Sequence, residues 1–264
     1  MNIKDISTQL MYTTTPIIVE KNDSTFSTGT GFIFLYKYNN ELSIPLLITN
    51  YHVVKNAVRG SFELHVEENK LPTQETISVQ FDSSVVDESK IDQLDLVAIP
   101  IGYAIKALNQ QSKKIFFRTI GKELIPTEEE IKGLAAVEDI VFIGYPNGIY
   151  DNINKMSIVR KGITATPIWN DFKGKSEFLI DAGVFPGSSG SPVFILNRGT
   201  FQDGDKIVVG DRLLFVGILY GTMINNGIGG NNSYLDLGTV IKSNIFNKQL
   251  EKYIENKKLI STIK

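Results

Sequence analysis

The sequence contains no cysteine, only two histidines and no long hydrophobic run among its 264 residues. Without cysteine the chain has no disulfide, no thiol nucleophile, no thiolate zinc site and no iron–sulfur cluster. No stretch approaches the roughly 18 apolar residues of a membrane span. The N-terminal stretch MNIKDISTQLMYTTTPIIVE also lacks the apolar core, about 7–15 residues long, of a secretory signal. We therefore expect a cytoplasmic protein without a membrane partner.

The chain also lacks an excess of charge of either sign. Its 27 basic and 29 acidic side chains give a formal net charge of −2. A nucleic-acid-binding surface normally has a basic excess, so DNA and RNA are not expected as partners. A hydrophobic content of 42% is ample for a large core.

Short runs rich in Val, Ile, Phe and Thr make up most of the chain, and Gly, Pro, Asn or Asp bound them. Examples are GTGFIFLY, IPLLITN, LDLVAIPI, DIVFIGYP and LLFVGILYG. Many closely spaced runs of this kind predict an all-β barrel or sandwich. The C-terminal segment differs, because its apolar side chains recur at helical spacing and predict a helix over residues 243–258. These side chains are Ile245, Phe246, Leu250, Tyr253 and Ile254.

The two histidines occupy different kinds of position. His52 ends the apolar run LLITNYHVV, where a side chain on a rigid scaffold can face a cleft. On this evidence a buried, structural histidine remains equally open for His52. His65 lies in FELHVEE, where it alternates with apolar residues and faces the polar side of a predicted strand. A structural role is favoured for His65.

The segment PGSSGSPV, residues 186–193, holds three serines between glycines and prolines. A serine nucleophile needs an adjacent base, and the base needs a third group to orient it. No histidine follows His65, which excludes the order Ser, acid, His of the α/β-hydrolases. The remaining common order is His, Asp, Ser. Asp95, between two leucines at the start of an apolar run, is favoured as the acid over Asp82, Asp87 and Asp92 in polar loop sequence.

Five segments then occur in a characteristic order: GTGFIF, LLITNYHVV, DLVAIPI, IGYPNGIYDN with IVRKGITA, and DAGVFPGSSGSPVF. Over roughly residues 15–250 the chain resembles bacterial trypsin-like serine peptidases of the trypsin/chymotrypsin superfamily. It is most similar to the protease domain of the high-temperature-requirement type. The resemblance implies one peptidase domain over residues 1–264, with two six-stranded antiparallel β-barrels and a C-terminal helix. The barrels are expected at about 12–108 and 136–242.

The resemblance also implies the roles of the site residues. The family pattern G-x-S-G-[GS]-P matches residues 187–192 and makes Ser189 the nucleophile, with His52 as base and Asp95 as its orienting acid. The backbone amides of Gly187 and Ser189 would form the oxyanion hole. The implied activity is serine endopeptidase, acting on protein or peptide substrates through an acyl-enzyme, with no metal and no cofactor.

The substrate pocket is expected, by the same resemblance, at Gly183, Tyr220, Thr222 and Gly238. Because Gly183 carries no acid, Lys and Arg before the scissile bond are disfavoured, and a small or medium apolar residue is expected. An inward-pointing Asp236 would change this expectation.

The chain departs from secreted digestive proteases at Ser188, where they have the aspartate that pairs with a new N-terminus. This activation switch is therefore absent. A regulatory protein partner could instead order the segment 183–189. The alternative function is a latent or inactive protease-fold module that binds peptides and needs a partner to form its oxyanion hole.

The contrast between the histidines gives a first prediction. His52→Ala should lower turnover by several orders of magnitude, since a triad residue acts as part of a unit. His65→Ala should stay within about tenfold of the parent chain. Peptidase assays on both variants check this, and equal losses would contradict the assignment of His52 as base.

Overall fold

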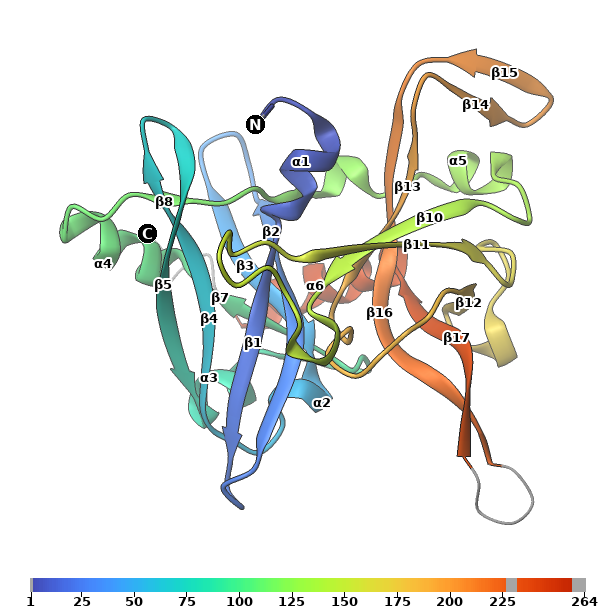
Figure 1. Ribbon diagram of the computed structural model, residues 1–264. Helices are drawn as coiled ribbons and strands as arrows, with labels where there is room; N and C mark the ends of the chain where they lie inside the picture. The colour runs from blue at the N-terminus through green and yellow to red at the C-terminus, as the bar shows by residue number, and fades with distance from the viewer. Residues whose placement is uncertain (1, 227–231, 258–264) are drawn as a thin grey trace.

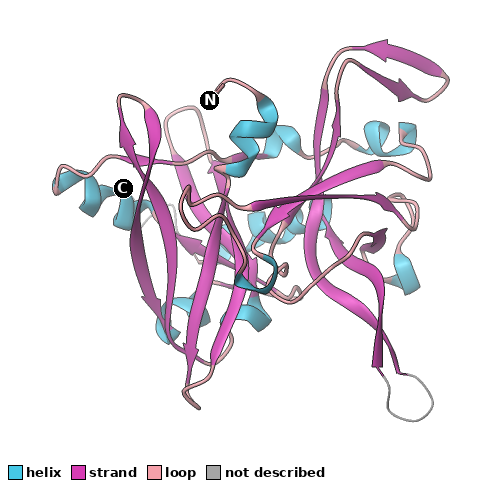
Figure 2. Cartoon of the chain, in the orientation of Figure 1, coloured by secondary structure: helices cyan, strands magenta, loops and turns pink. Residues whose placement is uncertain are grey.

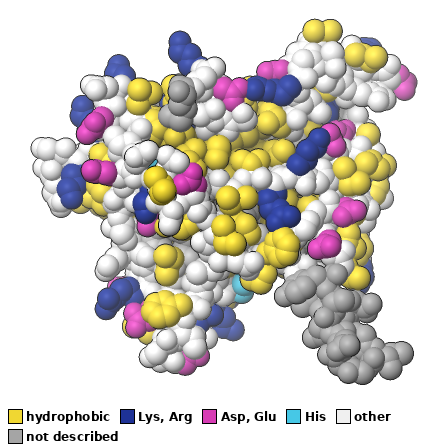
Figure 3. Space-filling model, in the orientation of Figure 1, with side chains coloured by type: hydrophobic (Ala, Val, Ile, Leu, Met, Phe, Trp, Pro, Cys, Tyr) yellow, Lys and Arg dark blue, Asp and Glu magenta, His cyan; other side chains and the backbone are white. Residues whose placement is uncertain are grey.

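The structure, a computed structural model, describes residues 2–226 and 232–257. Strands dominate it and form two halves that lie side by side, β1–β9 in one and β10–β17 in the other (Figures 1 and 2). This confirms the all-β class. In the view of Figure 3, charged side chains of both signs are scattered over the surface without a large patch of one sign. No helix within the described ranges has the length and apolar character needed to cross a membrane.

The first half is a nine-stranded sheet with the order β5-β4-β1-β2-β3-β7-β6, to which β8 adds beside β4 and β9 beside β2. Six of these strands are longer, with five or more residues each. The other three have two residues each, and two of them are held against the sheet by the buried side chains of Phe116 and Ile120. The sheet is therefore larger than the six strands predicted. The strands are β1 (Thr14–Lys21), β2 (Phe26–Lys37), β3 (Ser43–Asn50), β4 (Ala57–Glu68), β5 (Leu71–Asp82), β6 (Lys90–Ile91), β7 (Leu96–Pro100), β8 (Ile115–Phe116) and β9 (Ile120–Gly121).

The second half is a closed barrel of six antiparallel strands in the order β10-β11-β12-β17-β16-β13. A separate hairpin, β14 and β15, extends from the barrel at the upper right of Figure 1. The six-stranded barrel predicted for this half is confirmed. The strands are β10 (Asp139–Gly144), β11 (Ile158–Thr164), β12 (Glu177–Asp181), β13 (Pro192–Asn197), β14 (Thr200–Asp203), β15 (Lys206–Val209), β16 (Arg212–Asn226) and β17 (Asn232–Lys242).

Short helices connect the strands, and one longer helix follows the last of them. Thr127 caps the N-terminus of α5 with a reciprocal capping box to Glu130. The predicted C-terminal helix begins at Ser243 and ends at Asn256, while position 258 lies outside the described residues. The helices are α1 (Ile6–Met11), α2 (Tyr51–Val54), α3 (Ser83–Glu88), α4 (Gly102–Gln110), α5 (Glu128–Gly133) and α6 (Ser243–Asn256), with 3-10 turns η1 (Lys122–Leu124), η2 (Pro146–Gly148) and η3 (Phe172–Gly174).

One apolar cluster joins the two halves. It contains Phe32 from β2, Phe215 from β16 and Phe246 from α6, all buried and in edge-to-face ring contacts with one another. The buried stripe of α6 that the sequence predicts consists of Phe246, Leu250, Tyr253 and Ile254. Helix α6 therefore fills the junction and holds the sheet and the barrel in a fixed relation.

His65 lies within the first half rather than on an open strand surface. Its ring makes an edge contact with Tyr12, and its Nδ1 lies 3.1 Å from the Thr73 carbonyl oxygen. Burial lowers the pKa of His65 from its ordinary value of 6.5. The structural role favoured by the sequence is thus consistent with its surroundings.

This pKa shift predicts a pH dependence of stability. Because the folded chain binds a proton at His65 less readily than the unfolded chain, the free energy of unfolding should fall as the pH drops below about 6.5. Urea unfolding at a series of pH values would measure the loss. His65→Phe keeps a ring beside Tyr12 without a titrating group, so the loss should be smaller in this variant. An identical pH profile for the two chains would contradict the prediction.

Candidate active site

The predicted base and acid lie together at the end of the first sheet. His52 is in the short helix α2, directly after β3, and Asp95 immediately precedes β7. The His52 Nδ1 is hydrogen-bonded to Asp95 Oδ2, and the His52 backbone N–H donates to Asp95 Oδ1 at 3.0 Å. One carboxylate therefore orients both the ring and the backbone of His52.

Neighbouring backbone contacts hold this pair in place. The Asp95 carbonyl accepts hydrogen bonds from the Tyr51 N–H at 3.0 Å and the Asn50 side chain at 2.9 Å. Asn50 is also the register partner of Leu96 where β3 pairs with β7. The acid and the base are consequently fixed by the sheet itself, although they lie far apart in sequence.

Ser189 lies in the tight turn between β12 and β13 and comes from the second half. Gly187 and Gly190 on either side have φ angles of +86° and +90°, which side chains rarely allow. A Cβ at Gly190 would lie 1.9 Å from the Thr30 carbonyl oxygen, so a side chain there would force the turn away from β2. The glycine frame therefore permits the close approach of this turn to the first sheet.

Thr30 of β2 is the main partner of the turn. Its N–H donates to the Ser189 carbonyl at 2.8 Å, and its hydroxyl donates to the Gly187 carbonyl at 2.9 Å. The same hydroxyl accepts from the Tyr145 N–H at 3.0 Å, and the Thr30 carbonyl accepts from the Thr49 hydroxyl at 2.7 Å. Thr30 is fully buried, so water does not compete for these bonds.

The two amides predicted for an oxyanion hole belong to Gly187 and Ser189. Neither the Gly187 nor the Ser189 N–H donates to another residue that the structure describes. The Pro186 carbonyl accepts from the Asn147 N–H at 2.5 Å, and the Ser188 carbonyl accepts from the Ser191 N–H at 3.1 Å. Because C=O and N–H of a trans peptide point in opposite directions, both free amides face away from these internal partners.

The Ser189 hydroxyl is not bonded to His52 within the described part of the chain. It donates instead to the Tyr220 carbonyl at 3.4 Å, a long hydrogen bond. A rotation about the Ser189 side chain changes its partner, and such contacts are often loose before substrate binds. The structure thus joins His52 to Asp95 directly and leaves the Ser189 contact open.

Two of the residues predicted for the substrate pocket lie on adjoining strands, and a third follows the end of another strand. Gly238 of β17 is the register partner of Thr222 of β16, and the Thr222 hydroxyl donates to the Leu237 carbonyl at 3.3 Å. Gly183 follows the end of β12, which pairs with β17 on its other side. Asp236 is exposed, so it does not fill the space between these strands.

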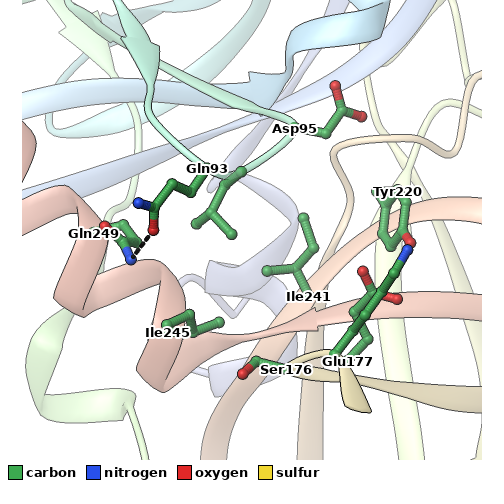
Figure 4. Close-up of a pocket in the computed structure, with 10 residues that line it drawn as sticks. Gln93, Asp95, Ser176, Glu177, Tyr220, Ile241, Ile245 and Gln249 are labelled. Carbon is green, nitrogen blue, oxygen red and sulfur yellow. Dashed lines mark hydrogen bonds between the residues drawn. The ribbon is translucent and has the colours of Figure 1, made fainter. Parts of the chain in front are cut away.

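Tyr220, the fourth predicted pocket residue, lines a separate cavity of about 380 Å³ beside Asp95 (Figure 4). Glu177 of β12 lines the same cavity and lies next to Tyr220. Burial and this carboxylate raise the pKa of Tyr220. The sequence analysis missed Glu177, as it missed Thr30, because nothing in their local sequence indicates contact with residues so far along the chain.

Comparison with known proteins identifies the family. The model of the trypsin-like peptidase domain matches residues 29–202, about two thirds of the chain. This chain belongs to the trypsin-like peptidase family. A comparison with curated proteins finds no match.

Solved structures agree with this trypsin-like peptidase fold. The HtrA-type protease AlgW, solved with a tripeptide, is 17% identical with a TM-score of 0.52, and the alignment covers 94% of this chain and 62% of that one. The serine endoprotease from Yersinia pestis is 16% identical with a TM-score of 0.52, covering 94% of this chain and 64% of that one. The present chain thus spans less than two thirds of the length of these two neighbours. At such identities the likeness concerns the fold.

The described residues of the chain contain no group of three or more His, Asp or Glu side chains arranged to hold a metal ion. The chemistry available at the site is that of an imidazole paired with a carboxylate, a serine hydroxyl and two free backbone amides. These are the groups that acyl transfer to a serine requires.

The hydrogen bonds of Thr30 predict how much this residue contributes to the stability of the fold. Thr30→Val keeps the side-chain shape but leaves the Gly187 carbonyl and the Tyr145 N–H without their partner. We expect the free energy of unfolding to fall by about 1–3 kcal/mol, since buried unpaired groups are costly. Thr30→Ser retains the hydroxyl and is the matched control. Equal stability of the Val and Ser variants in urea unfolding would show that these hydrogen bonds contribute little.

Proposed function

We propose that this chain is a serine endopeptidase that cleaves peptide bonds with His52, Asp95 and Ser189 as a catalytic triad. The observation that carries the proposal is the His52–Asp95 hydrogen bond. It is made near the Ser189 turn, since Asp95 lines the same cavity as Tyr220, whose carbonyl accepts from the Ser189 hydroxyl. An imidazole held at Nδ1 by a carboxylate presents its Nε2 as the base.

In this mechanism His52 removes the proton of the Ser189 hydroxyl as its oxygen attacks the substrate carbonyl. Asp95 stabilises the imidazolium that forms and keeps the ring in its orientation. The free N–H groups of Gly187 and Ser189 bind the oxyanion, and His52 then protonates the leaving amine. Water hydrolyses the resulting acyl-enzyme by the same steps, so the site needs no metal and no cofactor.

The internal bonds of the Ser189 turn support an oxyanion hole that exists before substrate binds. For the Gly187 amide to turn inward, the Pro186 carbonyl would have to leave the Asn147 N–H. A Cβ at Gly187 would also lie 2.5 Å from the Tyr145 carbonyl, so only glycine fits against this neighbouring turn. The proposal therefore favours an enzyme that is active at rest.

A second candidate is the latent peptide-binding module, in which a protein partner completes the site. One observation favours it: the Ser189 hydroxyl donates to Tyr220 rather than to His52. In that case a partner or substrate would have to turn the hydroxyl toward the base. Activity of the purified chain on an unfolded protein would exclude this candidate.

Labelling with a fluorophosphonate tests which serine reacts. Ser189→Ala should abolish both labelling and peptide cleavage. Ser188→Ala and Ser191→Ala are matched controls, because both hydroxyls are buried and have no hydrogen-bond partner, so their removal should leave much of both activities. Mass spectrometry of the labelled peptide locates the reactive residue. Labelling that persists in Ser189→Ala would overturn the proposed triad.

A further inference from the structure

A basic side chain that the sequence analysis did not single out lies beside the predicted substrate pocket. Arg160 is on β11, where burial alternates, so that Ile158, Arg160 and Gly162 lie on the more buried face. Exposed residues, among them Lys161, alternate with them. The Arg160 side chain is therefore on the face toward the barrel interior and not on the open surface.

The guanidinium of Arg160 occupies the space that a side chain at Gly183 would take. A Cβ built at Gly183 would lie 2.7 Å from Arg160 Nη2 and 3.7 Å from Arg160 Cζ. Gly162 lies two residues further along β11. A Cβ built there would lie 2.4 Å from the Asp181 carbonyl oxygen. The absence of side chains at Gly183 and Gly162 lets β11 bring a charge to the predicted pocket base.

One face of the guanidinium is covered and its edge is free. Arg160 Cζ lies 4.8 Å from the centre of the Phe185 ring, a cation–π contact that leaves the in-plane N–H donors available. Within the described ranges, no hydrogen bond and no ion pair joins the Arg160 side chain to another residue. Lys161 on the opposite face, by contrast, is paired with Asp139 at 2.8 Å.

A partly buried guanidinium without a partner is unfavourable, and a carboxylate satisfies it through two parallel hydrogen bonds. The neighbouring acids do not supply one, because Asp181 and Asp236 are exposed and neither is paired with Arg160. Phe185, whose ring contacts the guanidinium, directly precedes Pro186 in the Ser189 turn. The free donors therefore lie where the side chain of a bound substrate would enter.

We infer that Arg160 selects substrates with Asp or Glu immediately before the scissile bond. This inference rests on the proposed peptidase function and replaces the small apolar residue expected from the sequence. It is consistent with glycine at position 183, since a Cβ there would lie 2.7 Å from Arg160 Nη2. Arg160 is in this view a specificity-determining residue and takes no part in bond cleavage.

Matched peptides that differ only in Glu or Gln before the cleaved bond provide the test. The parent chain should cleave the Glu peptide with a kcat/KM about 10- to 100-fold higher, the effect of a charged hydrogen-bonded pair. Arg160→Gln should remove this ratio, and Arg160→Lys should keep part of it. Lys161→Gln, on the exposed face of the same strand, should leave it unchanged. A parent chain that cleaves both peptides equally, or prefers Gln, would overturn the inference.

Product binding gives a readout that does not depend on catalysis. Acetylated tetrapeptides ending in Glu or Gln are titrated by calorimetry into Ser189→Ala, and into the same chain with Arg160→Gln. We expect about 10- to 100-fold tighter binding of the Glu peptide, lost in the second chain. Equal affinities for the two peptides in Ser189→Ala would overturn the inference. Fluorophosphonate labelling of the parent chain separately reports on the proposed triad, so the two failures are distinguishable.

Discussion

The hydrogen bonds of Thr30 are the constraint on which the arrangement of the site depends. Thr30 belongs to the first sheet, yet its N–H and hydroxyl bind the carbonyls of the turn that carries Ser189. Its hydroxyl also binds the backbone of Tyr145 at the end of β10. A buried residue with all its polar groups occupied thus joins the two halves at the point where the proposed nucleophile must meet the proposed base.

The apolar cluster around Phe246 complements these bonds from another direction. Aromatic rings from β2, β16 and α6 meet at the junction, and dispersion between close-packed rings resists relative movement of the halves. Apolar packing favours the contact between the halves, because it removes large side chains from water. The directional bonds of Thr30 then determine the position of the Ser189 turn within that contact.

The charged side chains at the site differ in whether the described chain supplies them with a partner. His52 and Asp95 satisfy each other next to bonded backbone groups, so no unpaired charge remains there at rest. Arg160 differs, since its guanidinium is covered by Phe185 but has no counter-charge in the described chain. The donors of Arg160 and the amides of Gly187 and Ser189, which have no hydrogen-bond partner among the described residues, lie where a substrate is proposed to bind.

The sequence by itself determined the features that depend on local pattern. Short apolar runs predicted the strands, and the apolar stripe from Phe246 to Ile254 predicted α6. The order of His52, Asp95 and Ser189 along the chain indicated which side chains could form the site. Only the tertiary structure decided the rest. The role of Thr30, the closeness of Arg160 to Gly183, the three additional short strands and the contact of Ser189 with Tyr220 all join segments that are distant in sequence. Such contacts leave no periodicity in the chain, because each depends on how two separately formed strands or turns pack together.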